Sequence, residues 1–273
     1  MVRSLCLIRI SALFALAAWA HTLAANEVVL SSVADATLIE RAPDSSSGGA
    51  DFFNSGTTQA NTRNRGLFQF DLTSQIPAGA TITSATLQLQ VVKEAGCGLS
   101  QASTFGIYRM LRSWGEGSTL PLDNRGGLGG PAQPGDATWN SPSFGTSQTW
   151  GTPGGAAGID YVPNFSGSAL IYGRDQSPYG FESNPETVGD VQFWLDHPNA
   201  NFGWMLISSS EDTSSTARGF ASREDLLGRG PTLTVDFDLV PEPGTWALWG
   251  IGAIGLLGLR CWRKQREKKL PQN

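Results

Sequence analysis

Histidine and cysteine are scarce in this chain, which has two histidines and three cysteines among 273 residues. Hydrolases of the Ser-His-Asp or Cys-His type need a histidine base beside the nucleophile. Removal of the expected N-terminal leader leaves His197 alone, directly before a proline. No His-Glu-x-x-His, paired Cys-x-x-Cys or phosphate-cradling glycine motif is present. The sequence therefore predicts no catalytic residue and a protein that is not an enzyme.

The few cysteines also exclude an internal disulfide. Cys6 lies in the leader and Cys261 in the C-terminal tail, so Cys97 is the only thiol between them. The sequence is therefore compatible with an oxidising compartment, although the domain forms no internal disulfide there. Pairing of Cys97 between two chains stays open.

Basic residues are rare between the two ends of the chain. Setting aside the leader and the tail leaves 11 of the 19 basic residues and 23 of the 24 acidic ones, a net charge near −12. Nucleic acids are bound mainly through Lys and Arg on their phosphates. The sequence therefore predicts no nucleic-acid partner.

The N-terminus has the three parts of a secretory signal peptide. Arg3 and Arg9 are followed by an apolar run over residues 10–20 and by small residues at Ala24 and Ala25. The apolar run is shorter than the roughly 20 residues of a membrane span. Residues 1–25 are therefore predicted to be a signal peptide, and the protein to be exported through the inner membrane.

A second apolar segment lies near the C-terminus. Residues 246–259 contain four glycines and no charge, and a helix of this length spans only ~21 Å of a ~30 Å hydrocarbon core. We expect a single, marginal transmembrane helix over about residues 246–262, with a basic tail over residues 260–269. Basic residues favour the cytoplasmic side, which leaves the preceding domain outside. The chain would thus be held at a membrane by a weak anchor.

The sequence before this helix is Val240-Pro241-Glu242-Pro243. Motif, apolar helix and basic cluster, in this order over residues 240–269, resemble the PEP-CTERM sorting signal. The resemblance implies an exosortase, an integral membrane protease, as the partner that recognises and cuts the tail. It also implies a Gram-negative bacterium that produces exopolysaccharide, and delivery to the cell envelope, cell surface or extracellular matrix.

Residues 26–239 read as one domain of short strands separated by turns. Phe68, Phe70 and Leu72 alternate with polar residues, as in a half-buried strand. Val188, Val191 and Trp194 recur at three-residue spacing and predict a short helix over residues 187–196. The expected strands cover residues 28–33, 36–40, 66–72, 81–92, 105–111, 159–162, 169–172, 202–208, 217–222 and 232–239. We therefore predict an all-β protein, an antiparallel jelly-roll β-sandwich with one short helix.

Several segments of this domain resemble those of DNRLRE-type domains, and they occur in the same order. The resemblance implies a jelly roll similar to carbohydrate-binding modules, and a polysaccharide as the ligand. Glycine- and proline-rich residues between Trp114 and Trp139 depart from the family pattern where a ligand site would lie, so the fold transfers better than the binding behaviour. The matching segments are residues 32–37, 65–72, 76–80, 113–117, 137–140, 190–195, 201–204 and 220–224.

Sugar sites need aromatic faces for the apolar side of the ring and polar groups for the hydroxyls. Trp139 and Trp150, in the long loop over residues 115–158, and Tyr172 beside Arg174 are the candidates. The other tryptophans of the recurring segments, Trp114, Trp194 and Trp204, are assigned to the core.

An acidic domain can meet an acidic polysaccharide only through bridging cations or through arginines that line the site. Calcium prefers oxygen ligands, and Asp35, Asp44 and Asp51 are the candidate ligands. No EF-hand-like spacing supports them, so the calcium prediction rests on composition.

The sequence thus favours an exported surface or matrix protein that binds or organises extracellular polysaccharide. A polysaccharide-degrading enzyme with paired carboxylates is one alternative, for which Glu116, Asp136 and Asp160 border the long loop. These acids are interpreted as solvated turn residues, and Arg223 and Glu224 as members of a structural ion pair. A purely structural coat or adhesin component is another alternative.

Overall fold

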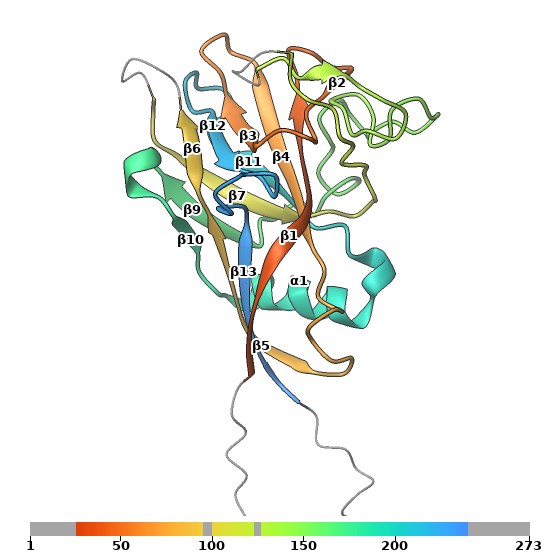
Figure 1. The fold of residues 1–273 in the computed structure, drawn as a ribbon, viewed down its shortest axis with the longest axis vertical. Coiled ribbons are helices and arrows are strands. Elements are labelled where there is room, and N and C mark those ends of the chain that lie inside the picture. The colour runs from red at the N-terminus through yellow and green to blue at the C-terminus, as the bar shows by residue number, and fades with distance from the viewer. Residues whose placement is uncertain (1–25, 95–99, 123–126, 240–273) are drawn as a thin grey trace, which may run out of the picture.

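The computed structural model describes residues 26–94, 100–122 and 127–239. This part of the chain is mostly β, with one α-helix, as predicted (Figure 1). The strands are β1 (Asn26–Ile39), β2 (Ser45–Ser46), β3 (Phe52–Thr57), β4 (Arg63–Phe70), β5 (Thr81–Leu89), β6 (Val91–Glu94), β7 (Ser103–Arg109), β8 (Gly130–Pro131), β9 (Gly167–Ile171), β10 (Tyr179–Phe181), β11 (Trp204–Ser208), β12 (Arg218–Ala221) and β13 (Thr232–Asp238). The helices are η1 (Arg174–Gln176), α1 (Pro185–Asp196) and η2 (Pro198–Ala200).

The long strand β1 belongs to two parts of an antiparallel sheet. Its first half pairs with β13, which continues to β5 and β10, and its second half pairs with β4, which continues to β11, β7 and β9. A bulge between Ser32 and Ala34 lets β1 bend from one part to the other. The sequence predicted two strands here, and the structure has one. The arrangement is consistent with the predicted β-sandwich.

A first hydrophobic core lies between these two parts. Leu87 and Leu233 reach it from one side, and Phe68, Phe105 and Trp204 from the other. Helix α1 adds Val191 and Trp194, as the three-residue spacing predicted. The helix begins at Pro185, two residues before the predicted start, because the Asn184 side chain caps the amides of Glu186 and Thr187.

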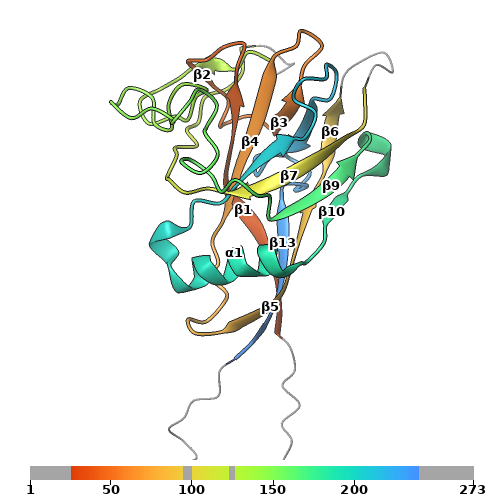
Figure 2. The ribbon, with the colours of Figure 1, turned by 180° about the vertical axis from the view of Figure 1, so that it is seen from behind.

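A second hydrophobic core covers the outer face of β4 and β11. Trp139 and Trp150 from the long loop pack there against Leu67 and Met205. All five residues of β11 are buried, because the strand is covered on both faces. In Figure 2 the loop, in green, lies beside β4 and β1 at the upper left. The long loop is therefore packed onto the sheet through Trp139 and Trp150, whereas Leu120 and Leu122 of the glycine- and proline-rich insertion are exposed.

Several predicted elements need correction. Residues 159–162 form no strand, and Tyr161 makes only isolated bridges with Met110 and Ala157. Strands β3 and β10 were not predicted, because the asparagine, serine and glycines in them weaken the alternating pattern. No helix in the described part of the chain is long and apolar enough to cross a membrane. The predicted signal peptide, transmembrane helix and basic tail lie outside the described residues.

The buried position of Trp150 leads to a stability prediction. Trp150→Ala should lower the free energy of unfolding by about 3–5 kcal/mol, because it opens a large cavity in the second core. Phe165→Ala is the matched control, since Phe165 is 53% exposed and surface changes usually cost under about 0.5 kcal/mol. Urea unfolding of the full chain measures both. Equal, small losses would contradict a core role for Trp150.

Candidate functional site

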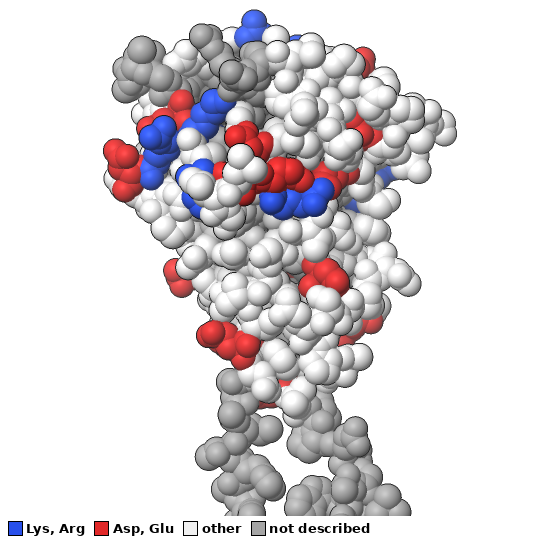
Figure 3. Space-filling model, in the orientation of Figure 1, with Lys and Arg blue, Asp and Glu red and all other residues white. Residues whose placement is uncertain are grey.

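A pocket of about 760 Å³ opens beside β6 and the loop between β12 and β13. Phe52, Leu120 and Leu226 give it apolar walls, and Leu226 is 96% exposed. Acidic and basic side chains also line the pocket, between these apolar residues. Figure 3 shows that acidic and basic residues gather in the upper part of this face. The complete wall consists of residues 49–52, 92–93, 120–121 and 224–226, with Arg174 and Arg229.

The loop over residues 222–230 forms one side of the pocket and is folded around Asp225. The Asp225 carboxylate accepts hydrogen bonds from the backbone amides of Leu227 and Arg229 and pairs with the Arg229 guanidinium at 2.6 Å. This pairing lowers the pKa of Asp225. At the start of the loop, the Ser222 hydroxyl donates to the carbonyl of Ala50 at 2.6 Å. The loop is therefore held to the segment before β3 at its start and braced internally by Asp225.

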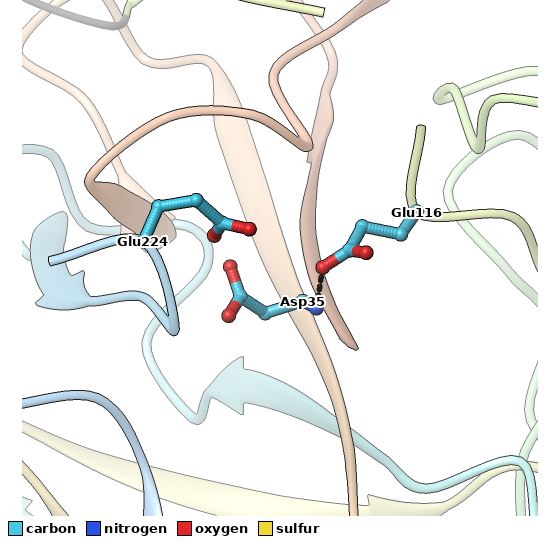
Figure 4. A group of neighbouring side chains, drawn as sticks. All are labelled: Asp35, Glu116 and Glu224. Atoms are coloured by element: carbon cyan, nitrogen blue, oxygen red, sulfur yellow. Dashed lines mark hydrogen bonds between the residues drawn. The ribbon is translucent and has the colours of Figure 1, made fainter. Parts of the chain in front are cut away.

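Next to the pocket lies an acidic cluster of Asp35, Glu116 and Glu224 (Figure 4). One carboxylate oxygen from each residue lies within 4.8 Å of the others. Asp35 comes from β1, Glu116 from the long loop and Glu224 from the pocket loop. The Asp35 amide donates to Glu116 Oε1 at 2.8 Å, the bond drawn in Figure 4. The cluster thus joins three distant parts of the chain.

Arg223 neutralises part of this negative charge. Its guanidinium donates to both oxygens of Glu116, at 2.6 and 2.9 Å, and its Nε lies 2.9 Å from Glu224 Oε1. Its backbone amide donates to Asp35 Oδ2 at 2.8 Å. The predicted structural ion pair of Arg223 and Glu224 is therefore confirmed. Glu224 Oε2 is buried without a hydrogen-bond partner.

Burial changes the acidity of two members of the cluster. Asp35 is 2% exposed, and its burial, with the nearby carboxylates of Glu224 and Glu116, raises its pKa to about 8. Hydrogen bonding to the Arg223 amide opposes that rise. Burial also raises the pKa of Glu224, with a further contribution from Glu116. The cluster therefore holds a proton on Asp35 at neutral pH.

Glycines in the long loop allow Glu116 to reach Asp35. Gly117 has a φ of +75°, and a Cβ there would lie 2.0 Å from Asp136 Oδ1. Asp136 Oδ2 accepts from the Thr119 hydroxyl and the Gln133 amide, which fixes this turn. Glu116, which binds the Asp35 amide and Arg223, and Asp136, which fixes the turn, thus have structural hydrogen bonds and are not solvated turn acids.

The predicted sugar-binding residues do not come together. Trp139 and Trp150 are each 4% exposed, so neither presents a ring face to a sugar, and that prediction is corrected. They are buried because the outer face of β4 and β11 is apolar and needs a cover. Tyr172 is 47% exposed but is not part of the pocket wall, whereas Arg174 is.

The predicted calcium ligands are also dispersed. Only Asp35 belongs to the acidic cluster. Asp44 is exposed and accepts from the Asn140 amide at 2.9 Å, and Asp51 is exposed on the pocket wall. Glu116 and Glu224 were missed as partners of Asp35, because they lie 81 and 189 positions away and no local spacing marks them.

Comparison with known families identifies one part of the chain. Residues 239–264 match the PEP-CTERM protein-sorting motif. The match includes the predicted motif residues Val240, Pro241, Glu242 and Pro243, which lie outside the described structure. The match covers the C-terminal segment and does not extend into the β domain. No curated protein matches the chain.

The raised pKa of Asp35 predicts a pH dependence of stability. In the unfolded chain Asp35 loses its proton near pH 3.8, and in the folded protein near pH 8. The folded state binds more protons between these values, so stability falls as pH rises through this window, by up to about 1.4 kcal/mol per pH unit. Asp35→Asn keeps an acceptor for the Arg223 amide and removes the titration. The variant should match the wild type near pH 4 and exceed its stability near pH 8.

Urea unfolding at a series of pH values measures this difference. Asp212→Asn, at an exposed position, is the matched control and should run parallel to the wild type. If the stability of Asp35→Asn also ran parallel to that of the wild type over this pH range, the pKa of Asp35 in the folded protein would not be raised.

Proposed function

We propose that this chain is an exported surface protein whose β domain binds extracellular polysaccharide in the pocket beside β6. The sorting motif at residues 239–264 indicates export and processing by an exosortase. Polysaccharide is the ligand that the sequence resemblances favour, and the pocket supplies a place for it.

The composition of the pocket is the observation that supports binding. Leu120 and Leu226 offer exposed apolar surface, and Arg174 and Glu224 add hydrogen-bonding groups to the wall. Lys93 lies with its ammonium 4.0 Å from the centroid of the Phe52 ring. Apolar contact combined with a few polar groups is the usual composition of a small-ligand site. A volume of about 760 Å³ is in the range of small-ligand sites.

The jelly-roll connectivity and the likeness to DNRLRE-type domains remain predictions and are part of this proposal. A large antiparallel sheet with one helix is compatible with both. Calcium also remains a prediction. Arg223 already joins Glu116 and Glu224 in the acidic cluster, so an ion there would compete with a guanidinium.

Affinity electrophoresis of the full chain in gels containing polysaccharide tests the proposal. Leu226→Ala and Arg174→Ala should each weaken binding at least about fivefold, which corresponds to about 1 kcal/mol. Phe165→Ala removes an exposed aromatic outside the pocket wall and should bind as the wild type does. The proposal fails if no polysaccharide, including that of the producing cells, retards the wild type.

A degradative enzyme is the second candidate, because glycosidases pair a protonated carboxyl with an ionised one. Asp35 with its raised pKa and Glu224 on the pocket wall form such a pair. Asp35, however, is 2% exposed, which favours binding over catalysis. Release of new reducing ends by the wild type, lost in Glu224→Gln, would establish the enzyme instead.

A further inference from the structure

The folded domain begins and ends at one tip of the molecule. Asn26 of β1 lies opposite Phe237 of β13, and Glu27 lies opposite Asp236. Figures 1 and 2 both show β1 starting and β13 ending at this tip, with β5 beside them. The chain therefore leaves the domain toward the sorting motif at this tip.

The tip carries acidic charge without a counterion on its strands. Glu27 and Asp236 face each other across the ladder, and Asp238 follows at the end of β13. Residues 26–32 of β1 and all of β5 and β13 contain no Lys or Arg. In the lower part of the face shown in Figure 3, the charged side chains are acidic and none is basic. Like charges directly opposite each other destabilise strand pairing.

The ladder is also irregular at the same place. The register between β13 and β5 shifts between Asp236 and Phe237, as it does at a β-bulge. Bulges disrupt the local hydrogen bonds and often end pairing. Phe237 is 5% exposed and is the last buried side chain of β13. Its burial opposes separation of the strand end, together with the pairing of Phe237 and Asp238 with β5.

The sorting motif follows this strand end almost immediately. Only Leu239 lies between Asp238, the last residue of β13, and Val240. An enzyme that binds a peptide in extended form needs free backbone on both sides of its target. The paired end of β13 would obstruct the enzyme sterically unless the last residues of β13 separate from the sheet.

We propose that the end of β13 opens from β1 and β5 to admit the exosortase, and that repulsion between Glu27 and Asp236 sets how readily it opens. This inference rests on the proposed processing by an exosortase. The tip is then the least stable part of the sheet, a local opening of the kind that frayed strand ends show. The remainder of the domain stays folded during cleavage.

Charge reversal separates strand opening from direct recognition of charge. Glu27→Lys and Asp236→Lys each turn the repulsion into attraction, and each should slow processing about three- to tenfold. The double variant restores a like-charge pair and should return to nearly the wild-type rate. Glu182→Lys makes the same change of net charge at an exposed position away from the tip and should have no effect. Pulse-chase labelling of the full chain, in cells that contain the exosortase, measures the rate of shortening.

The pattern among these variants decides the outcome. Slow single variants with a fast double variant support the opening of β13. Rates that stay at the wild-type value, or a double variant slower than either single one, overturn it. A wild type that is never shortened would instead overturn the proposed function.

A spacer provides an independent measurement. Eight Gly and Ser residues inserted after Asp238, between the strand end and the matched sorting motif, make opening of the strand unnecessary. The insertion should restore fast processing to Glu27→Lys. With the spacer present in both, Glu27→Lys and the wild type should be processed at equal rates. Continued slow processing of Glu27→Lys with the spacer would also overturn the inference.

Discussion

The architecture depends on covering the apolar outer face of β4 and β11. A strand such as β11, with five consecutive buried residues, cannot face water on one side. The chain covers it with the loop over residues 115–158, which has little regular structure but carries two tryptophans into the second core. Trp150 donates its indole N–H to the carbonyl of Thr138 within the loop itself. The ring of Trp150 is thus buried while its polar N–H keeps a hydrogen-bond partner.

This cover also explains the electrostatics of the acidic cluster. Glu116 lies at the start of the loop, and its contact with the Asp35 amide closes the loop over the second half of β1. Water is excluded from Asp35 as a result, and its carboxyl keeps a proton that an exposed aspartate would lose. Arg223 offsets the charges of Glu116 and Glu224. The acidity of the cluster therefore follows from the packing that holds the loop in place.

The sequence predicted elements whose signal is local. Alternation in residues 66–72 and the spacing of Val188, Val191 and Trp194 correspond to β4 and α1. The sorting motif was recognised because its parts are contiguous. The predicted sugar-binding roles of Trp139 and Trp150 were wrong. A loop tryptophan that covers a sheet and one that faces a ligand cannot be distinguished by the residues around them in the sequence. The pocket and the acidic cluster could not be predicted, because they join residues far apart in sequence through pairings that only the fold creates.

The shared tip of β1 and β13 has a consequence for the evolution of this protein. Neighbouring antiparallel residues such as Asn26 and Phe237 have Cα atoms about 5 Å apart. A domain whose ends are so close can be inserted into a surface loop of another protein at little entropic cost. The same geometry lets it be exchanged as a unit between different leaders and tails. The closeness of its two ends thus makes the β domain suited to insertion as one unit.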